Sequence, residues 1–287
     1  MSRLEITVLL PAKNEEIAIG STVERILSLY PGAEVIVVDD GSTDNTGSIA
    51  EESGALVIRH PYSKGNGSAI KTGLRAATKD LVVCMDADGQ HRPEDIGALL
   101  NKMSEGYDMV VGARDHEGQA GLHRCLANGF YNRFASWMVG HKIGDLTSGF
   151  RAVRRRKFLE FISLLPNKFS YPTTITMSFF RAGYSVAYVP ITVLQRAEGS
   201  KSHINLWKDG LRFLLIIFKV GTLFSPLKLF IPISFSYLIL GIGYYVYTFS
   251  VDHRLSSISV FLWSTSVTVF LIGLVSEQIT QLLYKDR

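Results

Sequence analysis

The chain has 287 residues, which suits one catalytic domain of about 200 residues with a further segment appended. Its net charge of +4 and pI near 9.0 form a weak, dispersed basic bias. This argues against a nucleic-acid-binding protein and is compatible with anionic lipid or a phosphorylated substrate. Cys84 and Cys125 have no metal-ligand or redox spacing, so we expect reduced, buried thiols.

Apolar strand-like runs alternate with helical patterns through the first half of the chain. The predicted strands are 6–10, 34–40, 55–60, 81–88 and 107–114, and the predicted helices are about 15–29, 43–53, 66–77 and 93–104. Strands that are apolar throughout, each followed by a helix, indicate an α/β fold with a mostly parallel sheet covered on both faces. Such sheets bind ligands at the carboxyl ends of their strands.

Unusual polar residues follow three of these predicted strands. They are residues 11–15 after the first strand, Asp39 and Asp40 after the second, and 86–91 after the fourth. Their coincidence at one edge of the sheet favours a nucleotide site. Turn and capping chemistry accounts for residues 41–46 but not for the acids, so we expect Asp40 to bind a nucleobase or ribose.

The segment "MDADGQH" (85–91) places two carboxylates one residue apart. Along a strand, Asp86 and Asp88 would point to the same side, where like charges repel unless a cation lies between them. Oxygen ligands of this kind favour Mg²⁺ or Mn²⁺, and Gln90 repeats the spacing as a third oxygen donor. We therefore predict a divalent metal that binds the phosphates of a nucleotide and stabilises a departing diphosphate. His91 is expected to be structural.

The composition changes near residue 204. The segment "INLWKDGLRFLLIIFKVG" places its charged residues along one helical stripe, which predicts an interfacial amphipathic helix at 204–222; an ordinary surface helix is the alternative. Two apolar stretches, about 227–249 and 258–283, are each long enough to cross about 30 Å of hydrocarbon. We expect a catalytic domain at 1–203 and a transmembrane hairpin within 226–284.

Basic residues mark one side of this hairpin. Arg254 lies in the connector, whereas the flanks of the hairpin carry Lys201, Lys208, Arg212, Lys219, Lys228, Lys285 and Arg287. The positive-inside rule therefore places both ends and the catalytic domain in the cytoplasm. We expect a multi-pass protein of the cell (inner) membrane.

Four motifs, "LLPAKNEE", "VVDDGSTDNT", "GNGSAIKTGLRAA" and "MDADGQHRPED", occur in an order that resembles the family 2 glycosyltransferases of the GT-A (Rossmann-like) fold. "TSGFRA" (147–152) and "RAEGSK" (196–201) are similar to the polyprenyl-phosphate branch, which includes dolichol-phosphate mannose synthase and undecaprenyl-phosphate glucosyltransferases. The resemblance covers about residues 5–203. It implies inverting transfer of a hexose from a UDP- or GDP-sugar to undecaprenyl or dolichyl phosphate.

The resemblance also implies roles for individual residues. The nucleotide sugar would be bound by Pro11, Ala12, Glu15, Asp40, Asp86, Arg196 and Lys201. The metal would be held by Asp86, Asp88 and Gln90. The acceptor phosphate would meet Arg114, Arg124 and Ser148, and the catalytic residues would be Asp88, Arg114 and Arg124. The chain departs from the family pattern at Lys13, where an aromatic residue is frequent, at Gly89, where a bulky one is common, and at 171–180, which lacks an acid.

The chemistry of the acceptor supports this branch independently. A sugar hydroxyl needs a general base, whereas a lipid monophosphate, with a second pKa of about 6, is already ionised near pH 7 and needs cations. The chain offers them as Arg114, Arg124, Arg151, Arg196 and Lys201. We expect "RRRK" (154–157) to be solvated surface, and Lys64 either reaches phosphate or belongs to a capped helix start.

Two other functions stay open. One is a membrane synthase that extends a glycan or polysaccharide, although "VLQRAEGSK" lacks the Gln-x-x-Arg-Trp motif usual in processive relatives. The other is an inactive nucleotide-sugar-binding membrane scaffold, against which the intact Asp86 and Asp88 argue. A homo-oligomer is compatible with either.

Overall fold

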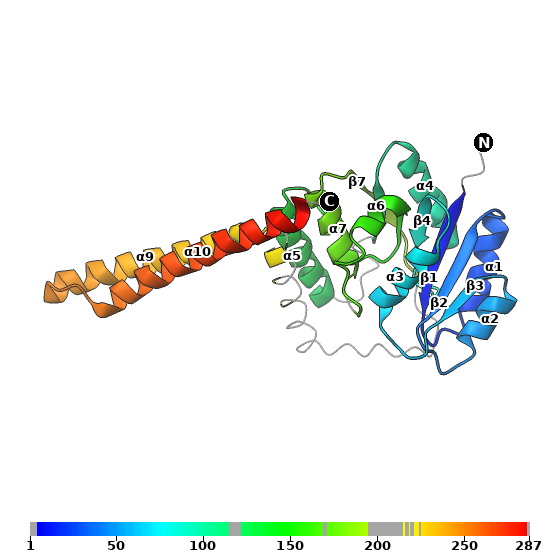
Figure 1. The fold of residues 1–287 in the computed structure, drawn as a ribbon, viewed down its shortest axis with the longest axis horizontal. Coiled ribbons are helices and arrows are strands. Elements are labelled where there is room, and N and C mark those ends of the chain that lie inside the picture. Colours follow the sequence, from blue (N-terminus) through cyan, green and yellow to red (C-terminus); the bar gives the residue numbers. More distant parts are fainter. Residues whose placement is uncertain are drawn as a thin grey trace. The chain divides into compact units, whose positions relative to one another are not determined.

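The computed structural model describes residues 5–114, 122–168, 171–194, 215, 218, 221–223 and 225–285. Only the backbone is described for 122–128, 252 and 283–285. The chain divides into two compact units, Met1–Trp137 with His141–Ile204, and Met138–Gly140 with Asn205–Arg287. Figure 1 shows the elements of both units.

Within the described residues of the first unit, seven strands form one sheet in the order β3-β2-β1-β4-β6-β5-β7. The strands are β1 (Ile6–Ala12), β2 (Glu34–Asp39), β3 (Leu56–Arg59), β4 (Leu81–Cys84), β5 (Met109–Arg114), β6 (Arg151–Arg154) and β7 (Val186–Ile191). All neighbours are parallel except β6, which is antiparallel to β4 and β5. The predicted mostly parallel sheet is confirmed.

Helices cover both faces of this sheet, as its apolar strands require. They are α1 (Ile19–Leu29), α2 (Thr46–Glu52), α3 (Asn66–Ala76), a 3-10 turn η1 (Pro93–Asp95), α4 (Ile96–Ser104), α5 (Leu122–Val139), α6 (Arg155–Glu160) and α7 (Tyr171–Arg181). Helices α1, α2 and α4 pack on one face, and α3, α6 and α7 pack on the other.

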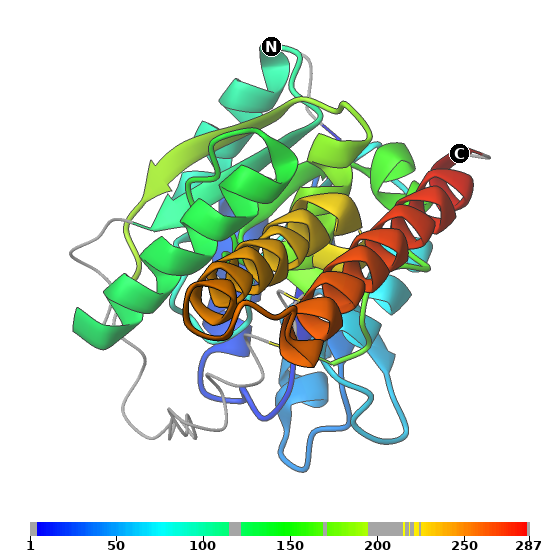
Figure 2. The ribbon, with the colours of Figure 1, turned by 90° about the vertical axis from the view of Figure 1, so that its left-hand side faces the viewer.

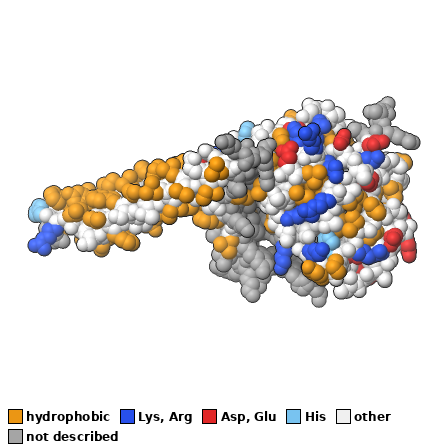
Figure 3. Space-filling model, in the orientation of Figure 1, with side chains coloured by type: hydrophobic (Ala, Val, Ile, Leu, Met, Phe, Trp, Pro, Cys, Tyr) orange, Lys and Arg blue, Asp and Glu red, His pale blue; other side chains and the backbone are white. Residues whose placement is uncertain are grey.

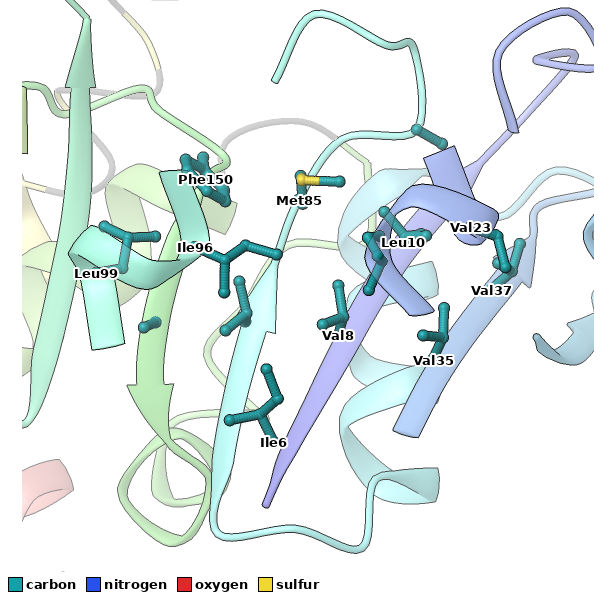
Figure 4. Packing of buried hydrophobic residues seen from close by; sticks show 14 of the residues in the cluster. Ile6, Val8, Leu10, Val23, Val35, Val37, Met85, Ile96, Leu99 and Phe150 are labelled. Atoms are coloured by element: carbon teal, nitrogen blue, oxygen red, sulfur yellow. The ribbon is translucent and has the colours of Figure 1, made fainter. Parts of the chain in front are cut away.

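Alternate side chains of β1 point toward the helices on opposite faces of the sheet. Val8 and Leu10 are fully buried and pack with β2 and with Val23 of α1 (Figure 4). Leu9 faces the opposite layer, where a Cβ on Gly73 of α3 would come within 2.0 Å of the Leu9 Cδ1 atom. A glycine at this position therefore allows α3 to lie directly against β1.

The fourth strand is shorter than predicted. β4 pairs with β1 and β6 only as far as Cys84, and the chain then turns, with Gly89 at a φ of 72°. Asp86 and Asp88 therefore lie in a loop, and the prediction that strand alternation points them to one side is wrong. Their common orientation has to come from the loop.

The second unit contains two long helices, α9 (Pro226–Asp252) and α10 (Ser257–Lys285), which run antiparallel side by side (Figure 2). Segments Pro226–Val251 and Ser257–Leu282 have mean hydropathies of 1.7 and 2.1 and are long and apolar enough to cross a membrane. Most of their large hydrophobic side chains are exposed, and these cover the face of the hairpin visible in Figure 3. The predicted helix at 204–222 lies outside the described residues, apart from 215, 218 and 221–223, which are helical.

The seam between these two helices is made of small residues. The buried positions recur every seven residues, at Ser234, Gly241 and Thr248 of α9 and at Ser259, Ser266, Gly273 and Thr280 of α10. In the middle, Ser234 Oγ donates to the Ser266 carbonyl at 2.9 Å, and Ser266 Oγ donates to the Ser234 carbonyl at 2.8 Å. At the end of the hairpin away from the connector, Glu277 accepts a hydrogen bond from the Leu227 backbone N–H at 3.3 Å. This backbone N–H belongs to the first turn of α9, where it has no partner within the helix.

Candidate functional site

A cavity of about 350 Å³ opens at the carboxyl edge of the sheet. It is lined by Pro11, Ala12, Lys13, Glu15, Asp40, Ser63, Gly65, Asn66, Ala69, Asp86, Ala87 and Asp88. These residues lie at or after the ends of β1, β2, β3 and β4, the edge at which the sequence predicts ligand binding. Six residues expected to contact the nucleotide sugar or metal meet here: Pro11, Ala12, Glu15, Asp40, Asp86 and Asp88.

The loops after β1 and β2 are tied together beside this cavity. Asn14 adopts a left-handed φ of 55°, and its Oδ1 accepts the Thr43 backbone N–H at 2.8 Å. The Glu15 backbone N–H donates to Thr46 Oγ1 at 2.8 Å, and Glu16 Oε2 accepts the Asn45 N–H at 3.1 Å. The two motifs containing these residues therefore form one hydrogen-bonded unit that shapes the cavity.

Asp40 is buried, and its carboxylate is filled by protein donors. Oδ1 lies 2.7 Å from His60 Nδ1 and accepts the Lys64 N–H at 2.8 Å. Oδ2 accepts hydrogen bonds from Ser63 Oγ and the Gly65 N–H, each at 2.8 Å. Burial raises the pKa of Asp40, but the hydrogen bonds from His60 and the loop outweigh it and hold the pKa below its usual value. Since a carboxylate has about four acceptor positions, Asp40 fixes the 63–65 turn at the cavity rim.

Asp86 is in a different situation, because 37% of its side chain is exposed. His91 Nε2 approaches Asp86 Oδ2 at 3.5 Å, and a Cβ on Gly149 would come within 2.8 Å of the same oxygen. Burial raises the pKa of this carboxyl, whereas contact with His91 and the positive charges of His91, Arg114 and Arg151 lower it, with a net decrease. Asp86 is therefore an ionised group with one side open to the cavity.

Asp88 and Gln90 follow Asp86 in the same loop, but of these two only Asp88 is among the described residues that line the cavity. Asp88 lines the cavity, and its Oδ1 accepts the Gln90 backbone N–H at 3.1 Å. The Gln90 amide nitrogen donates to the Leu194 carbonyl at 3.4 Å, which leaves the amide oxygen for another partner. Among the described residues no three His, Cys, Asp or Glu side chains gather into a metal cluster. Two carboxylates and an amide oxygen fit Mg²⁺ or Mn²⁺, ions that take the rest of their ligands from water and substrate phosphates.

Arg114, at the end of β5, is held by an acid that the sequence did not reveal. Its Nε and Nη2 donate to Asp145 Oδ2 and Oδ1 at 2.8 and 3.0 Å, and Nη2 also donates to Thr147 Oγ1 at 2.5 Å. Burial raises the pKa of Asp145, but the hydrogen bond and charge of Arg114 reverse this and lower it. Nη1 of Arg114 makes no hydrogen bond to the described residues.

Residues 7–161 match the model of glycosyl transferase family 2. The chain belongs to this family. Residues 225–282 match the GtrB C-terminal hairpin, which coincides with α9 and α10.

Two relatives of this family 2 member match about two thirds of the chain. Polyprenol monophosphomannose synthase of Mycolicibacterium smegmatis is 32% identical over 67% of this chain and 78% of its own length. Dolichyl-phosphate hexose transferase of Haloferax volcanii is 33% identical over 69% of this chain and 86% of its own length.

A solved structure is similar in fold. Glucosyl-3-phosphoglycerate synthase from Mycobacterium tuberculosis, in complex with Mn²⁺, UDP and phosphoglyceric acid, has a TM-score of 0.58 and 26% identity over 72% of this chain and 73% of its own. Another structure of that enzyme contains Mg²⁺ and UDP. The GT-A architecture expected from the motifs is thereby confirmed.

Other predicted site residues are not among the described residues that line the cavity. Ser148 is 1% exposed, and its hydroxyl lies 3.5 Å from the Phe150 carbonyl oxygen. Arg124 lies on α5, but its side chain is outside the described residues, as are Arg196 and Lys201 entirely. Arg151 is fully buried, with its Nη1 donating to Thr176 Oγ1 at 3.1 Å.

Two further segments with basic residues form hydrogen bonds or ion pairs with other parts of the protein. At the start of α3, the Gly67 and Ser68 N–H groups donate to the carbonyls of Lys168 and Asn167 at 3.1 and 2.8 Å, so this helix start is occupied by protein. In the "RRRK" segment, Lys157 and Arg154 pair with Asp108 at 2.7 and 3.6 Å. The Arg154 and Lys157 side chains remain 44% and 31% exposed, so the segment lies at the surface as expected, and two of its members are paired with Asp108.

Proposed function

We propose that this chain transfers a hexose from a nucleotide diphosphate sugar to a polyprenyl phosphate at a membrane. The observation that carries the proposal is the convergence of Asp86 and Asp88 with the ends of β1 and β2 on one cavity, in a family 2 chain that ends in an apolar hairpin. The relatives named for polyprenol phosphate and dolichyl phosphate substrates support the acceptor class.

The donor would lie in the cavity with its base and ribose against Pro11, Ala12 and Glu15. Asp86, Asp88 and Gln90 would hold Mg²⁺ or Mn²⁺, which supplies positive charge to the diphosphate as it leaves. The similar enzyme crystallised with UDP and either Mn²⁺ or Mg²⁺ supports this arrangement. Asp40 contributes by holding the 63–65 turn of the cavity rim.

The acceptor would be a phosphate monoester that is already ionised near neutral pH, because its second pKa is about 6. One of its oxygens forms a bond to C1 of the sugar while the bond from C1 to the diphosphate oxygen breaks, and the nucleoside diphosphate leaves with the electron pair. Arg114, oriented by Asp145, can offer Nη1 to the acceptor phosphate. Arg124 would be its second cation, and Arg196 and Lys201 would meet the diphosphate.

The hairpin of α9 and α10 would anchor the enzyme where its lipid substrate resides. The basic flanks of the hairpin favour a cytoplasmic location for residues 1–203, next to the inner leaflet of the cell membrane. The segment 204–222 would lie along that surface as an amphipathic helix. Apolar side chains exposed along both helices support the spanning role.

The proposal is tested by incubating the purified full-length protein with a panel of UDP- and GDP-sugars and either undecaprenyl or dolichyl phosphate. Mass spectrometry should detect a polyprenyl phosphate that has gained one hexose. Transfer to a glycan chain instead would support the polysaccharide alternative, and nucleotide-sugar binding without transfer or hydrolysis would support the scaffold.

A further inference from the structure

The imidazole of His91 has an environment unlike that of an ordinary buried histidine. Only 8% of it is exposed, it stacks on Phe150 with ring centroids 5.1 Å apart, and its Nδ1 has no hydrogen-bond partner among the described residues. His60, by contrast, is satisfied on both nitrogens, by Asp40 and Thr72. For His91 the only polar contact in the described part of the chain is Nε2 with Asp86 Oδ2, at 3.5 Å.

A backbone wall confines the Asp86 carboxylate on another side. A Cβ on Gly149 would lie 2.8 Å from Asp86 Oδ2 and 3.0 Å from Oδ1, so a larger residue here would displace the carboxylate from its present orientation. The wall is itself fixed, because the Gly149 carbonyl accepts the Tyr171 hydroxyl at 3.1 Å and the Ser148 carbonyl accepts Arg151 Nη2. Asp86 is thus enclosed by His91 and Gly149, with its remaining open side lining the cavity.

We propose that His91 is a positioning residue that directs its Nε2–H at Asp86 Oδ2 and holds the carboxylate in the orientation that binds a divalent cation. This inference rests on the metal site of the proposed function. Stacking on Phe150 fixes the imidazole plane, and the Gly149 backbone prevents the carboxylate from turning away. Partners of this kind, which touch a metal ligand rather than the metal, typically change metal affinity about 10- to 100-fold.

Two substitutions at His91 distinguish the contribution of its N–H donor from that of its aromatic ring. His91→Phe keeps an aromatic ring against Phe150 but removes the donor, whereas His91→Gln keeps an N–H donor without the ring. Mn²⁺ is titrated into the full-length protein in detergent, with saturating UDP or GDP, and its dissociation constant is measured by calorimetry. We expect His91→Phe to weaken Mn²⁺ binding about 10- to 100-fold, and His91→Gln to restore a large part of the loss.

A matched control is available in His141, which stacks on Phe180 with centroids 5.3 Å apart and is exposed. His141→Phe makes the same chemical change and should leave Mn²⁺ affinity unaltered. Gly149→Ala tests the opposite wall independently and should also weaken Mn²⁺ binding. The unfolding temperature of each variant, measured without metal, shows whether a loss of binding is simply a loss of fold.

The outcomes distinguish this inference from the function on which it rests. If the wild type binds Mn²⁺ and His91→Phe binds it equally well, the positioning role is overturned while the metal site stands. Equal weakening in His91→Phe and His91→Gln, at unchanged unfolding temperatures, also overturns the role of the N–H group. If the wild type binds no divalent cation with either nucleotide, the metal site of the proposed function fails, and the inference fails with it.

Discussion

Asp40 and Asp86 are acids from different loops that line the same cavity, yet their carboxylates are used in different ways. Asp40 accepts four short contacts from its own protein, at 2.7 to 2.8 Å. Asp86 has one contact with His91, at 3.5 Å, and 37% of its side chain is exposed. The hydrogen-bond acceptor positions of Asp40 are occupied by protein donors, whereas Asp86 keeps acceptor positions available for a ligand.

This difference distinguishes a carboxylate whose acceptor positions are filled by protein from one that is partly exposed, without reference to a bound molecule. Burial raises the pKa of both carboxyls, but each pKa is lowered overall, by hydrogen bonds at Asp40 and by the His91 contact together with nearby positive charges at Asp86. A shifted pKa therefore does not distinguish them, whereas the number of remaining acceptor positions does. The contrast leads to predictions about which substitution affects turnover and which affects stability.

The largest effect is expected at Asp88, whose carboxylate lines the cavity. Asp88→Asn should retain the fold but lower turnover by at least about 100-fold, the scale of one lost electrostatic contact in a transition state. Hexose transfer to polyprenyl phosphate and the unfolding temperature should be measured on the same preparation. Full activity of this variant, or of the wild type in excess chelator, would exclude the metal assignment.

A substitution at Asp40, whose carboxylate is filled by protein donors, should lower the free energy of unfolding. Asp40→Asn replaces one acceptor oxygen by an NH₂ group that faces N–H donors, so we expect a loss of about 1–3 kcal/mol, the usual cost of buried groups left without partners. Thermal unfolding in detergent measures it. Glu51→Gln is the control, because Glu51 forms an exposed pair with Arg59 at 2.8 Å and such pairs contribute little. An unchanged unfolding temperature for Asp40→Asn would mean that Asp40 does not hold the 63–65 turn.

The contribution of Asp40 to stability should also depend on pH. The pKa of Asp40 is lower in the folded chain than in the unfolded chain, where it is about 3.9. Its contribution to stability is therefore complete above that value and is lost as the pH falls through the lower folded value. Asp145, paired with Arg114, acts in the same direction. The unfolding temperature of the wild type should fall in acid below about pH 4, and the fall should be shallower in Asp40→Asn. Equal slopes for the two proteins would contradict this account.

The smallest effect is expected at Gln90, whose amide oxygen is an uncharged ligand. Gln90→Ala should weaken Mn²⁺ binding less than Asp88→Asn does, because ligand charge strongly influences the affinity for such ions. Calorimetry with the same nucleotide compares the two variants directly. A larger loss for Gln90→Ala would show that its contact with Leu194 organises the site.

Much of the fold was accessible from the sequence because its strands are apolar throughout and its helices alternate with them. The first five strands and four helices of the sheet domain were predicted within a few residues, except that β4 ends at Cys84 and α1 begins only at Ile19. Strand β6, which runs antiparallel between β4 and β5, was not predicted. Its four residues contain Arg151, a charge that interrupts the apolar pattern from which strands are predicted.

The site was accessible only in part, for a physical reason. Strand ends mark an edge of the sheet, so the residues around Pro11, Asp40 and Asp86 could be expected to meet. The partner of a side chain depends on contacts between segments distant in sequence. Asp145 lies 31 residues from Arg114, and no spacing rule joins them. The contact of His91 with Asp86 was likewise inaccessible from spacing, because it depends on how the loop turns after β4.

The hairpin seam has a consequence for how the two apolar helices recognise each other. In a bilayer, hydrophobicity cannot favour one helix pairing over another, because lipid tails are as apolar as leucine. Small residues repeated every seven positions let the backbones approach, and the paired hydroxyls of Ser234 and Ser266 select one vertical alignment. Sliding either helix by one turn would break that pair and move Glu277 away from the first turn of α9. The alignment of the hairpin is thus encoded in its few polar atoms, and its many large apolar side chains remain free to face lipid.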